Sequence, residues 1–299
     1  MLRESGKVKT VIGNTKFSLE ASANESFRIR DIFIAEPAAE YATLRTNKTV
    51  VGYFRTGTGT LGNHLHYPIT DQEEVTLLSK LIGQGIFRQI PVPSGSVFTI
   101  EDIHDAGSVV TVVYDEYDQS DVSPNEPNGE NSKQYDLINY GRFSGTLAEG
   151  YNLYETQQTS NAYPAFPYGK CVPSKHVITL HGICFGDIGR TGGTAANKQY
   201  TKFLKLVKNR KTLYDDDMLG FPYIGSAPAA DGVTIATGQS RAGNFDDIDL
   251  RQPLIFAKPI IFEPGDDVDL SVSTIISAGV ACLTAKDAEV GLICTVNLL

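Results

Sequence analysis

The sequence has no tryptophan, only two methionines and no apolar run that could cross a bilayer as a helix. A membrane-spanning helix needs roughly 18 or more consecutive apolar residues, and no stretch of the sequence approaches that length. The N-terminal residues also lack the apolar segment of a secretory signal peptide. The sequence therefore predicts synthesis in the cytoplasm, without a signal peptide and without a membrane span.

Positive charge is scarce as well. The chain carries 26 Lys and Arg against 35 Asp and Glu, a formal net charge of −9. Proteins whose main task is holding nucleic acid neutralise phosphates with an excess of Lys and Arg. The charge balance therefore excludes that task, and any contact with nucleic acid must be local.

Cysteine is sparse and unpaired in sequence. Structural zinc sites normally show closely spaced ligand pairs, and no CxxC spacing occurs here. Cys184 and Cys294 lie within apolar, strand-like runs. We expect buried small hydrophobic side chains in preference to disulfides or metal ligands at all four positions, Cys171, Cys184, Cys282 and Cys294.

Glycine, proline and aromatic residues are plentiful, with 28 Gly, 14 Pro, 14 Tyr and 14 Phe. This composition favours many short strands joined by tight turns over a helical bundle. With 41% hydrophobic and 20% charged residues the chain is apolar enough to fold. The first prediction is an all-β protein.

Alternation of apolar and polar residues supports that prediction near the N-terminus. Phe27 and Ile29 share one parity, and Ile32 and Ile34 share the opposite one. A β-bulge near Asp31 would explain the switch, because one extra residue turns the following side chains to the other face.

Further apolar alternation between turn residues predicts about ten more strands. Residues 74–82 and 147–157 are the two candidates for short helices. Pro264 and Gly265 separate two alternating runs and predict a hairpin or corner there. The strand candidates are residues 49–54, 74–78, 97–103, 108–114, 177–185, 200–207, 233–237, 254–262, 268–273 and 290–296.

A polar stretch interrupts this pattern from residue 115 to about 167, with one plausible strand at 135–140. Loops of that length are usually functional or disordered. We therefore predict one elaborated β-sandwich spanning 1–299 with a loop-rich excursion at about 115–170. The alternative is two β-barrels split near residue 165.

The many strands, the corner at Pro264 and Gly265 and the β-rich C-terminus resemble the jelly-roll proteins of viral particles. The resemblance implies an all-β, jelly-roll-like sandwich or barrel with long loop excursions, possibly as two stacked barrels. It also implies a capsid or capsid-decoration subunit of the virion, phage-type in our reading, that binds other virion proteins and copies of itself as a trimer or larger ring. A small positive arm at residues 1–16 suits such a subunit without direct nucleic-acid binding.

His64 and His66 form the segment with most chemical character, because two His at i and i+2 on a strand point to one face and can chelate a metal. This resembles the first metal motif of cupins, which implies a metal-dependent enzyme as an alternative function. The pattern then departs from the family. Only Asp71, Glu73 and Glu74 approach the expected Glu, and after the Pro93-Ser94-Gly95 turn Phe98 stands where a metal-binding His belongs. In the alternative interpretation both His are partly buried, hydrogen-bonded side chains.

Four carboxylates crowd the end of one predicted strand, at Asp115, Glu116, Asp118 and Asp121. Such a density can gather a hard cation, so these residues are candidate calcium ligands. EF-hand spacing is absent, and a solvated loop is the alternative. No nucleophile elbow or phosphate loop is complete, so we expect a non-enzymatic protein.

Basic residues concentrate between Lys198 and Lys211, beside Tyr200 and Phe203. They could meet nucleic acid, but Lys along an edge strand also guards against aggregation. We favour a solvated or subunit-pairing edge. A carbohydrate- or receptor-binding module is the remaining alternative function, based on aromatic residues of the polar stretch that could stack on sugars: Tyr151, Tyr154, Tyr163, Phe166 and Tyr168.

Overall fold

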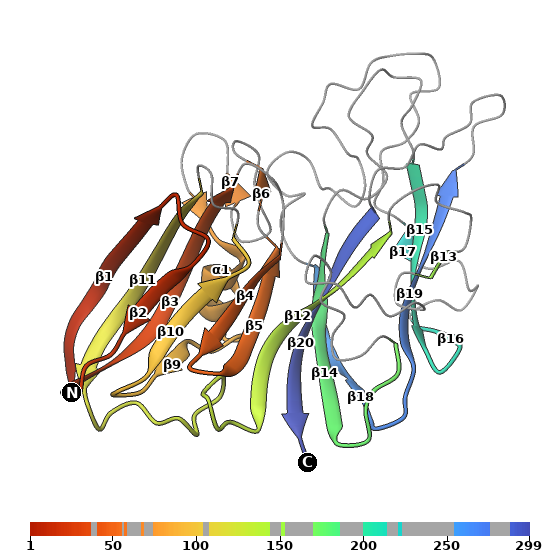
Figure 1. Cartoon of the computed structure of the whole chain (residues 1–299). Coiled ribbons are helices and arrows are strands. Elements are labelled where there is room, and N and C mark those ends of the chain that lie inside the picture. Colours follow the sequence, from red (N-terminus) through yellow and green to blue (C-terminus); the bar gives the residue numbers. More distant parts are fainter. Residues whose placement is uncertain are drawn as a thin grey trace. The chain divides into compact units, whose positions relative to one another are not determined.

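The computed structural model shows an all-β protein (Figure 1). Strands account for 62% of the described residues, the sheets are antiparallel apart from one short pairing, and the described residues contain one short helix. No helix in this part of the chain is long and apolar enough to span a membrane. The described residues are 1–36, 41–55, 57–58, 67–68, 74–103, 108–143, 151–152, 170–185, 200–213, 221–222, 254–275 and 288–299.

The chain divides into two compact units. The described residues of unit 1 fall in 1–138 and 293–299, and those of unit 2 fall in 139–292. Both boundaries lie inside strands, so β12 (Gln134–Phe143) and β20 (Ala288–Leu298) each contribute residues to both units.

Unit 1 contains two main sheets. The first follows the order β1 (Leu2–Ile12), β11 (Val109–Asp118), β3 (Glu25–Glu36), and β3 also pairs with β9 (Ile90–Val92) and with β6 (Gly57–Thr58). The second follows the order β2 (Phe17–Glu20), β10 (Val97–Glu101), β4 (Tyr41–Thr46), β5 (Thr49–Arg55). Two-residue strands β7 (Tyr67–Pro68) and β8 (Glu74–Val75) pair with each other.

The predicted bulge in β3 is confirmed. Val113 lies opposite Asp31 and Tyr114 opposite Ile29, so the register shift falls at Arg30. The bulge lets alternating residues on both sides of it point into the core, and all four expected apolar side chains are buried: Phe27, Ile29, Ile32 and Ile34. Phe17, Leu44 and Phe98 of the second sheet are also fully buried.

Helix α1 (Leu77–Gly83) contacts β3. Thr76 caps its N-terminus by accepting a hydrogen bond from the Ser79 amide at 3.0 Å, and its hydroxyl also donates to the carboxylate of Asp31. Burial raises the pKa of Asp31 above its usual range, although the hydrogen bonds from Thr76 and Ile32 oppose that shift. The sequence predicted both a strand at 74–78 and a helix over 74–82. The strand is confined to β8, Glu74–Val75, and the helix exists but begins at Leu77.

Unit 2 also contains two main sheets. The first has the order β12, β20, β14 (His176–Phe185), β18 (Leu254–Phe262). The second has the order β13 (Tyr151–Asn152), β19 (Val268–Ile275), β15 (Tyr200–Lys208), β16 (Lys211–Thr212), and β17 (Phe221–Pro222) pairs with β15. Buried apolar side chains fill its described interior, including Ile178, Leu180, Leu206, Phe262 and Leu270.

The two units repeat one strand order. When the two-residue strands β6, β7, β8 and β17 are left out, eight strands remain in each unit. Numbered in chain order, the first, eighth, third and sixth strands form one sheet, and the second, seventh, fourth and fifth form the other. In unit 1 these are β1-β11-β3-β9 and β2-β10-β4-β5, and in unit 2 they are β12-β20-β14-β18 and β13-β19-β15-β16. The sequence has no detectable internal repeat, so the repetition lies in topology.

Several local predictions need correction. Residues 2–12 form β1, paired along β11, where a positive arm was expected. β11 continues through Asp118, so the first residues of the predicted excursion are strand. Cys184 and Cys294 are buried as predicted, but Cys171 is exposed. The strand predicted at 233–237, Cys282 and most of the helix predicted at 147–157 lie outside the described residues; within the last, Tyr151–Asn152 is the strand β13.

Candidate functional site

The residues of the cupin-like prediction are only partly described. His64 and His66, with Asp71 and Glu73, lie outside the described residues. Two other parts of that motif are visible: residues 93–95 form the turn between β9 and β10, and Phe98 is fully buried in β10. Phe98 therefore has a packing role.

The four candidate calcium ligands lie at the end of β11 and in the turn after it. Asp115 is 7% exposed, and its Oδ1 atom accepts hydrogen bonds from the Ser5 hydroxyl at 2.8 Å and the Gly6 amide at 2.9 Å. Arg30, the bulge residue of β3, approaches the same oxygen at 3.4 Å. The positive φ of Gly6 (73°) accompanies a register shift in β1 that presents its amide to this carboxylate.

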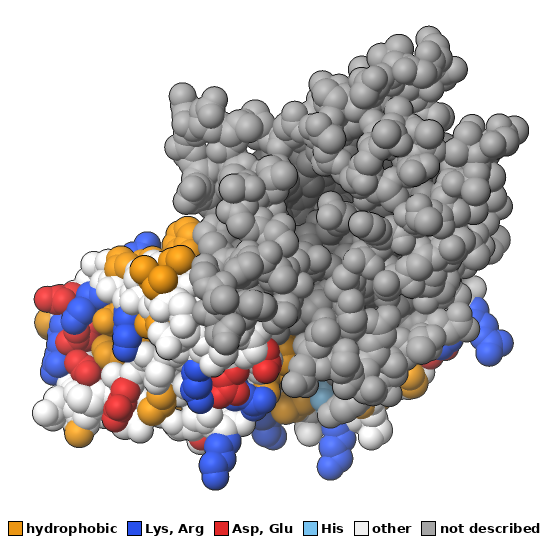
Figure 2. Space-filling model, turned by 45° about the horizontal axis from the view of Figure 1, so that its top comes forward, with side chains coloured by type: hydrophobic (Ala, Val, Ile, Leu, Met, Phe, Trp, Pro, Cys, Tyr) orange, Lys and Arg blue, Asp and Glu red, His pale blue; other side chains and the backbone are white. Residues whose placement is uncertain are grey.

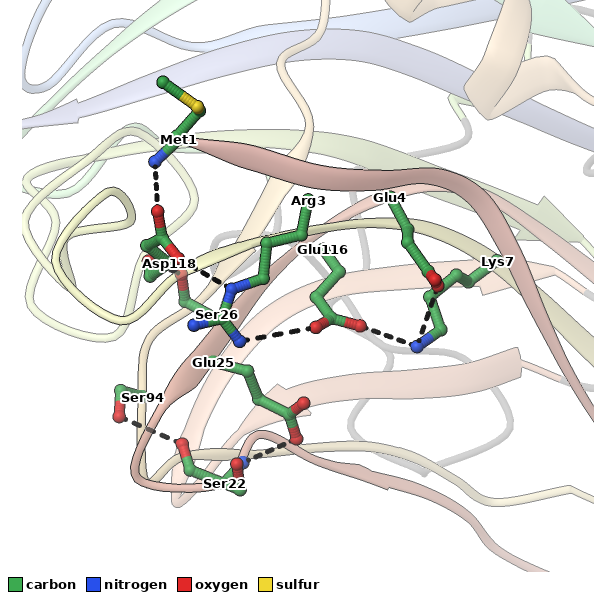
Figure 3. Close-up of polar contacts among 10 residues, drawn as sticks. All are labelled: Met1, Arg3, Glu4, Lys7, Ser22, Glu25, Ser26, Ser94, Glu116 and Asp118. Carbon is green, nitrogen blue, oxygen red and sulfur yellow. Dashed lines mark hydrogen bonds and ion pairs between the residues drawn. The ribbon is translucent and has the colours of Figure 1, made fainter.

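Basic groups of β1 engage the next two carboxylates (Figure 3). Lys7 Nζ lies 2.6 Å from Glu116, and Arg3 Nε lies 2.6 Å from Asp118. The Lys7 hydrogen bond holds the pKa of Glu116 below its usual range. The pKa of Asp118 is lowered by hydrogen bonds from the Met1 amino group at 2.9 Å and from Arg3.

Each of the four carboxylates therefore pairs with a cationic group of the chain, and two of these groups are shared: Arg3 contacts Glu116 and Asp118, and the Met1 amino group contacts Asp118 and Asp121. No group of three or more His, Cys, Asp or Glu side chains suited to hold a metal occurs among the described residues. Calcium binding at Asp115, Glu116, Asp118 and Asp121 stays a prediction, and the ion pairs to β1 are the use of these side chains that the structure shows.

A second polar cluster joins three turns of unit 2, and we call residues 170–175, 208–211 and 263–267 the unit 2 turn cluster. Asn209 stands at its centre with a φ of 50°. Its amide donates to the Asp267 carbonyl at 3.0 Å, its Oδ1 atom accepts from the Asp267 amide at 2.7 Å, and its Nδ2 atom donates to Asp266 at 2.7 Å. One asparagine thus fastens the β15–β16 turn to the β18–β19 turn.

Unit 1 repeats this arrangement in residues 19–24, 46–49 and 93–97, the unit 1 turn cluster. Asn47 has a φ of 52°. Its amide donates to the Val97 carbonyl at 2.8 Å, its Oδ1 atom accepts from the Val97 amide at 3.0 Å, and its Nδ2 atom donates to Ser96 at 3.3 Å. Asn47 and Asn209 are therefore structurally equivalent, as are Val97 and Asp267.

The third turn of each cluster matches as well. In unit 1 the Gly95 amide donates to Ala21, and the Ala21 amide donates to Ser96. In unit 2 the Gly265 amide donates to Val172, and the Val172 amide donates to Asp266. Gly95 and Gly265 both have positive φ, at 75° and 87°. In the sequence, this equivalence is visible in the matching residues Asn47 and Asn209 and in the matching residues Gly95 and Gly265.

The two turn clusters differ in charge. The unit 2 cluster has five cations and three carboxylates, Glu263, Asp266 and Asp267. Among the described residues, only Lys208 of these cations forms an ion pair, with Asp266 at 2.9 Å. The other four are Lys170, Lys175, Arg210 and Lys211. The unit 1 cluster has one cation, Lys48, and one carboxylate, Glu20. At the positions equivalent to Lys170, Lys175 and Lys211 it has Leu19, Asn24 and Thr49.

A buried carboxylate in unit 1 was not predicted. Asp136, in β12, is 4% exposed. It accepts hydrogen bonds from the Arg88 amide at 2.8 Å, the Arg88 guanidinium at 3.0 Å, Asn128 at 3.1 Å and the Thr295 hydroxyl at 2.8 Å. All three donor residues belong to unit 1. Asp136 therefore links the segment before β9 (Arg88), the β11–β12 connection (Asn128) and β20 (Thr295). With its bonding capacity used internally, it has a structural role.

The sequence matches no model of a known protein family, and a search of curated proteins finds no relative.

Proposed function

We propose that this chain is a virion structural protein, a capsid or capsid-decoration subunit that acts by self-assembly into trimers or larger rings. The observation that carries the proposal is the strand order shared by both units. In each unit, the two sheets are built from four main strands each, and early and late strands of the unit alternate within them. This order supports a jelly roll, a fold used by viral capsid proteins, lectins and cupins. We therefore interpret each unit as one jelly roll.

Exposed aliphatic side chains on sheet edges support self-assembly. β1 ends one sheet of unit 1 and carries Val8, 60% exposed, and Ile12, 68% exposed. β18 ends the equivalent sheet of unit 2 and carries Ile261, 52% exposed. Apolar side chains at sheet edges gain from burial against a neighbouring copy.

Both edge strands also resist simple strand addition. β1 is interrupted by two register shifts, and Pro259 removes an amide donor from β18. Contacts through side chains therefore suit these edges better than backbone pairing between copies, which would extend without limit.

The alternative functions remain a carbohydrate- or receptor-binding module and a cupin-like enzyme. The described interior of unit 1 is packed with apolar side chains such as Phe17, Phe98 and Val112, which favours a structural role. Glycan-array binding by the purified protein would support the receptor alternative. Stoichiometric iron, manganese or zinc that is lost in His64→Ala/His66→Ala would support the enzyme.

Light scattering coupled to size-exclusion chromatography tests the proposal on the full chain. We expect a trimer or a larger ring at micromolar concentration. In Val8→Glu/Ile12→Glu we expect smaller species, because two carboxylates would be buried in the contact. Lys48→Gln/Lys133→Gln makes the same change in net charge at exposed positions of unit 1 and should leave the assembly unchanged. A wild-type protein that stays monomeric at high concentration would overturn the proposal.

A further inference from the structure

We propose that the unit 2 turn cluster binds the surface of an anionic phospholipid bilayer through Lys170, Lys175, Arg210 and Lys211. The inference goes beyond the virion proposal and does not require self-assembly. It concerns contact with one face of a bilayer.

Hydrogen bonds between the three turns bring these cations to one end of unit 2. Asn209 joins the turn that carries Arg210 and Lys211 to the turn at residues 263–267. The bonds between Val172, Gly265 and Asp266 add the turn that carries Lys170 and Lys175. The backbone that carries the cations is therefore already fixed by hydrogen bonds, so binding does not have to order it.

These cations are available to an external partner. Lys175, Arg210 and Lys211 are exposed and Lys170 is half-buried, and none of the four forms an ion pair with a described residue. Figure 2 shows Lys and Arg side chains projecting from the described surface. By contrast, Arg3 and Lys7 of β1 form ion pairs within unit 1, with Asp118 and Glu116 respectively.

The equivalent positions of unit 1 act as an internal comparison. The same turns and the same asparagine are present there, but three of the four cations are replaced by Leu19, Asn24 and Thr49. Since the unit 1 turn cluster forms without them, the fold of the turns does not require these charges. We therefore attribute these four charges in unit 2 to the binding of a ligand.

A bilayer suits this cluster better than nucleic acid does. The chain has a net charge of −9. A long, flexible nucleic acid would extend beyond the cluster and be repelled by the acidic remainder of the chain. A flat membrane touches one end of the unit, and charges further away than about 10 Å are screened at 0.1 M salt. Pro264, an exposed apolar residue of the cluster, suits the interfacial region of a bilayer, whereas no exposed aromatic residue is described there for base stacking.

Co-sedimentation of the full chain with vesicles tests the inference. We expect binding to vesicles of phosphatidylcholine with 30% phosphatidylglycerol at roughly 0.1 M salt, little binding to pure phosphatidylcholine, and release at higher salt. Each cation near an anionic surface strengthens binding by about fivefold. Lys175→Gln/Arg210→Gln/Lys211→Gln should therefore lower the partition coefficient by roughly 100-fold.

The matched control is Lys48→Gln/Lys133→Gln/Lys258→Gln, which removes the same charge from exposed positions outside the unit 2 turn cluster. We expect it to bind as the wild type does, and both variants to keep the wild-type melting temperature. Equal loss in the two variants would reduce the effect to net charge and overturn the inference. So would equal binding to neutral vesicles, or DNA binding that depends on the three residues without vesicle binding. Because light scattering reports assembly separately, failure here leaves the virion proposal standing.

Discussion

The two units of this chain join three turns in the same way, but with different residues around the shared asparagine. Each fastens three turns around an asparagine in the left-handed region, at Asn47 and at Asn209, with the same backbone and side-chain hydrogen bonds. The residues between those fixed points differ: Ser96 in unit 1 stands where Asp266 stands in unit 2. Backbone N–H and C=O groups at such turns need hydrogen-bond partners, so the same hydrogen bonds occur in both units. The exposed side chains around them are free to differ.

The units also use charge differently. In unit 1, carboxylates at the end of β11 pair with basic groups of β1, which holds the edge strand in place. In unit 2, four cations of the turn cluster form no ion pair among the described residues. The first pattern stabilises a strand edge and the second leaves charge available for a partner. The following experiments test this contrast.

The largest effect is expected from the buried carboxylate of unit 1. Asp136→Ala leaves the Arg88 guanidinium, Asn128 and Thr295 without their acceptor, and we expect a loss of about 3–5 kcal/mol in the free energy of unfolding. Urea denaturation gives the total. Hydrogen exchange of β11 and β14 amides reports the two units separately, and protection in β11 should fall first.

Asp136→Asn keeps the shape of the side chain and should cost less than Asp136→Ala. The exposed neighbour Lys133 supplies the control, since Lys133→Gln should change stability by less than about 0.5 kcal/mol. Equal stability of Asp136→Ala and the wild type would contradict the structural role.

The asparagine equivalence predicts matched losses in the two units. Asn47→Ala and Asn209→Ala should each cost about 2 kcal/mol, from left-handed strain on alanine and lost side-chain hydrogen bonds. Chemical denaturation measures the loss, and hydrogen exchange should assign each loss to its own unit.

Asn47→Gly and Asn209→Gly separate the two contributions, because glycine removes the hydrogen bonds but accepts a positive φ. Both glycine variants should be more stable than the alanine variants. A measurable loss in only one unit would show that the turns are fastened by different means after all.

Acid should weaken the β1 edge of unit 1. The pKa values of Glu116 and Asp118 are below their usual ranges in the folded protein. Their stabilisation is therefore present above the unfolded pKa values, near 4.5 and 3.8, and is lost as pH falls through the lower folded values. Melting temperatures between pH 7 and pH 3 test this, and Arg3→Gln/Lys7→Gln should lessen the drop by a few degrees.

Among the described residues of unit 2, Asp266 is a carboxylate of the same kind and allows a comparison. Burial alone would raise the pKa of Asp266, but hydrogen bonds from Asn209 and Lys208 outweigh it and lower the pKa. Lys208→Gln should therefore reduce the acid sensitivity of unit 2 and leave that of unit 1 unchanged. A pH profile that is identical in all three proteins would show that these ion pairs contribute nothing measurable.

The smallest effect is expected from metal. Because the four carboxylates at the end of β11 accept hydrogen bonds or ion pairs from other groups of the chain, a chelator should change the melting temperature by less than about 1 °C. Differential scanning calorimetry with and without calcium makes the comparison. A rise of several degrees with calcium, abolished in Asp115→Asn, would restore the calcium site.

Much of the fold was predictable because strands leave a local pattern. The bulge in β3 follows from a change of parity between Ile29 and Ile32. The corner at Pro264 and Gly265, where the chain passes from β18 in one sheet to β19 in the other, follows from turn chemistry. β1 was missed because its exposed, charged face resembles an arm. The candidate site was less predictable, since no local feature distinguishes a carboxylate that gathers calcium from one that pairs with a distant arginine.

The sequence alone determined the all-β class, the short helix and the core face of β3, because alternation and turn residues act over a few neighbours. Only the tertiary structure decided the repeated strand order, the equivalence of Asn47 and Asn209 and the pairing of Arg3 with Asp118. These depend on contacts between residues far apart in the chain, and such pairings follow from the summed packing of whole sheets.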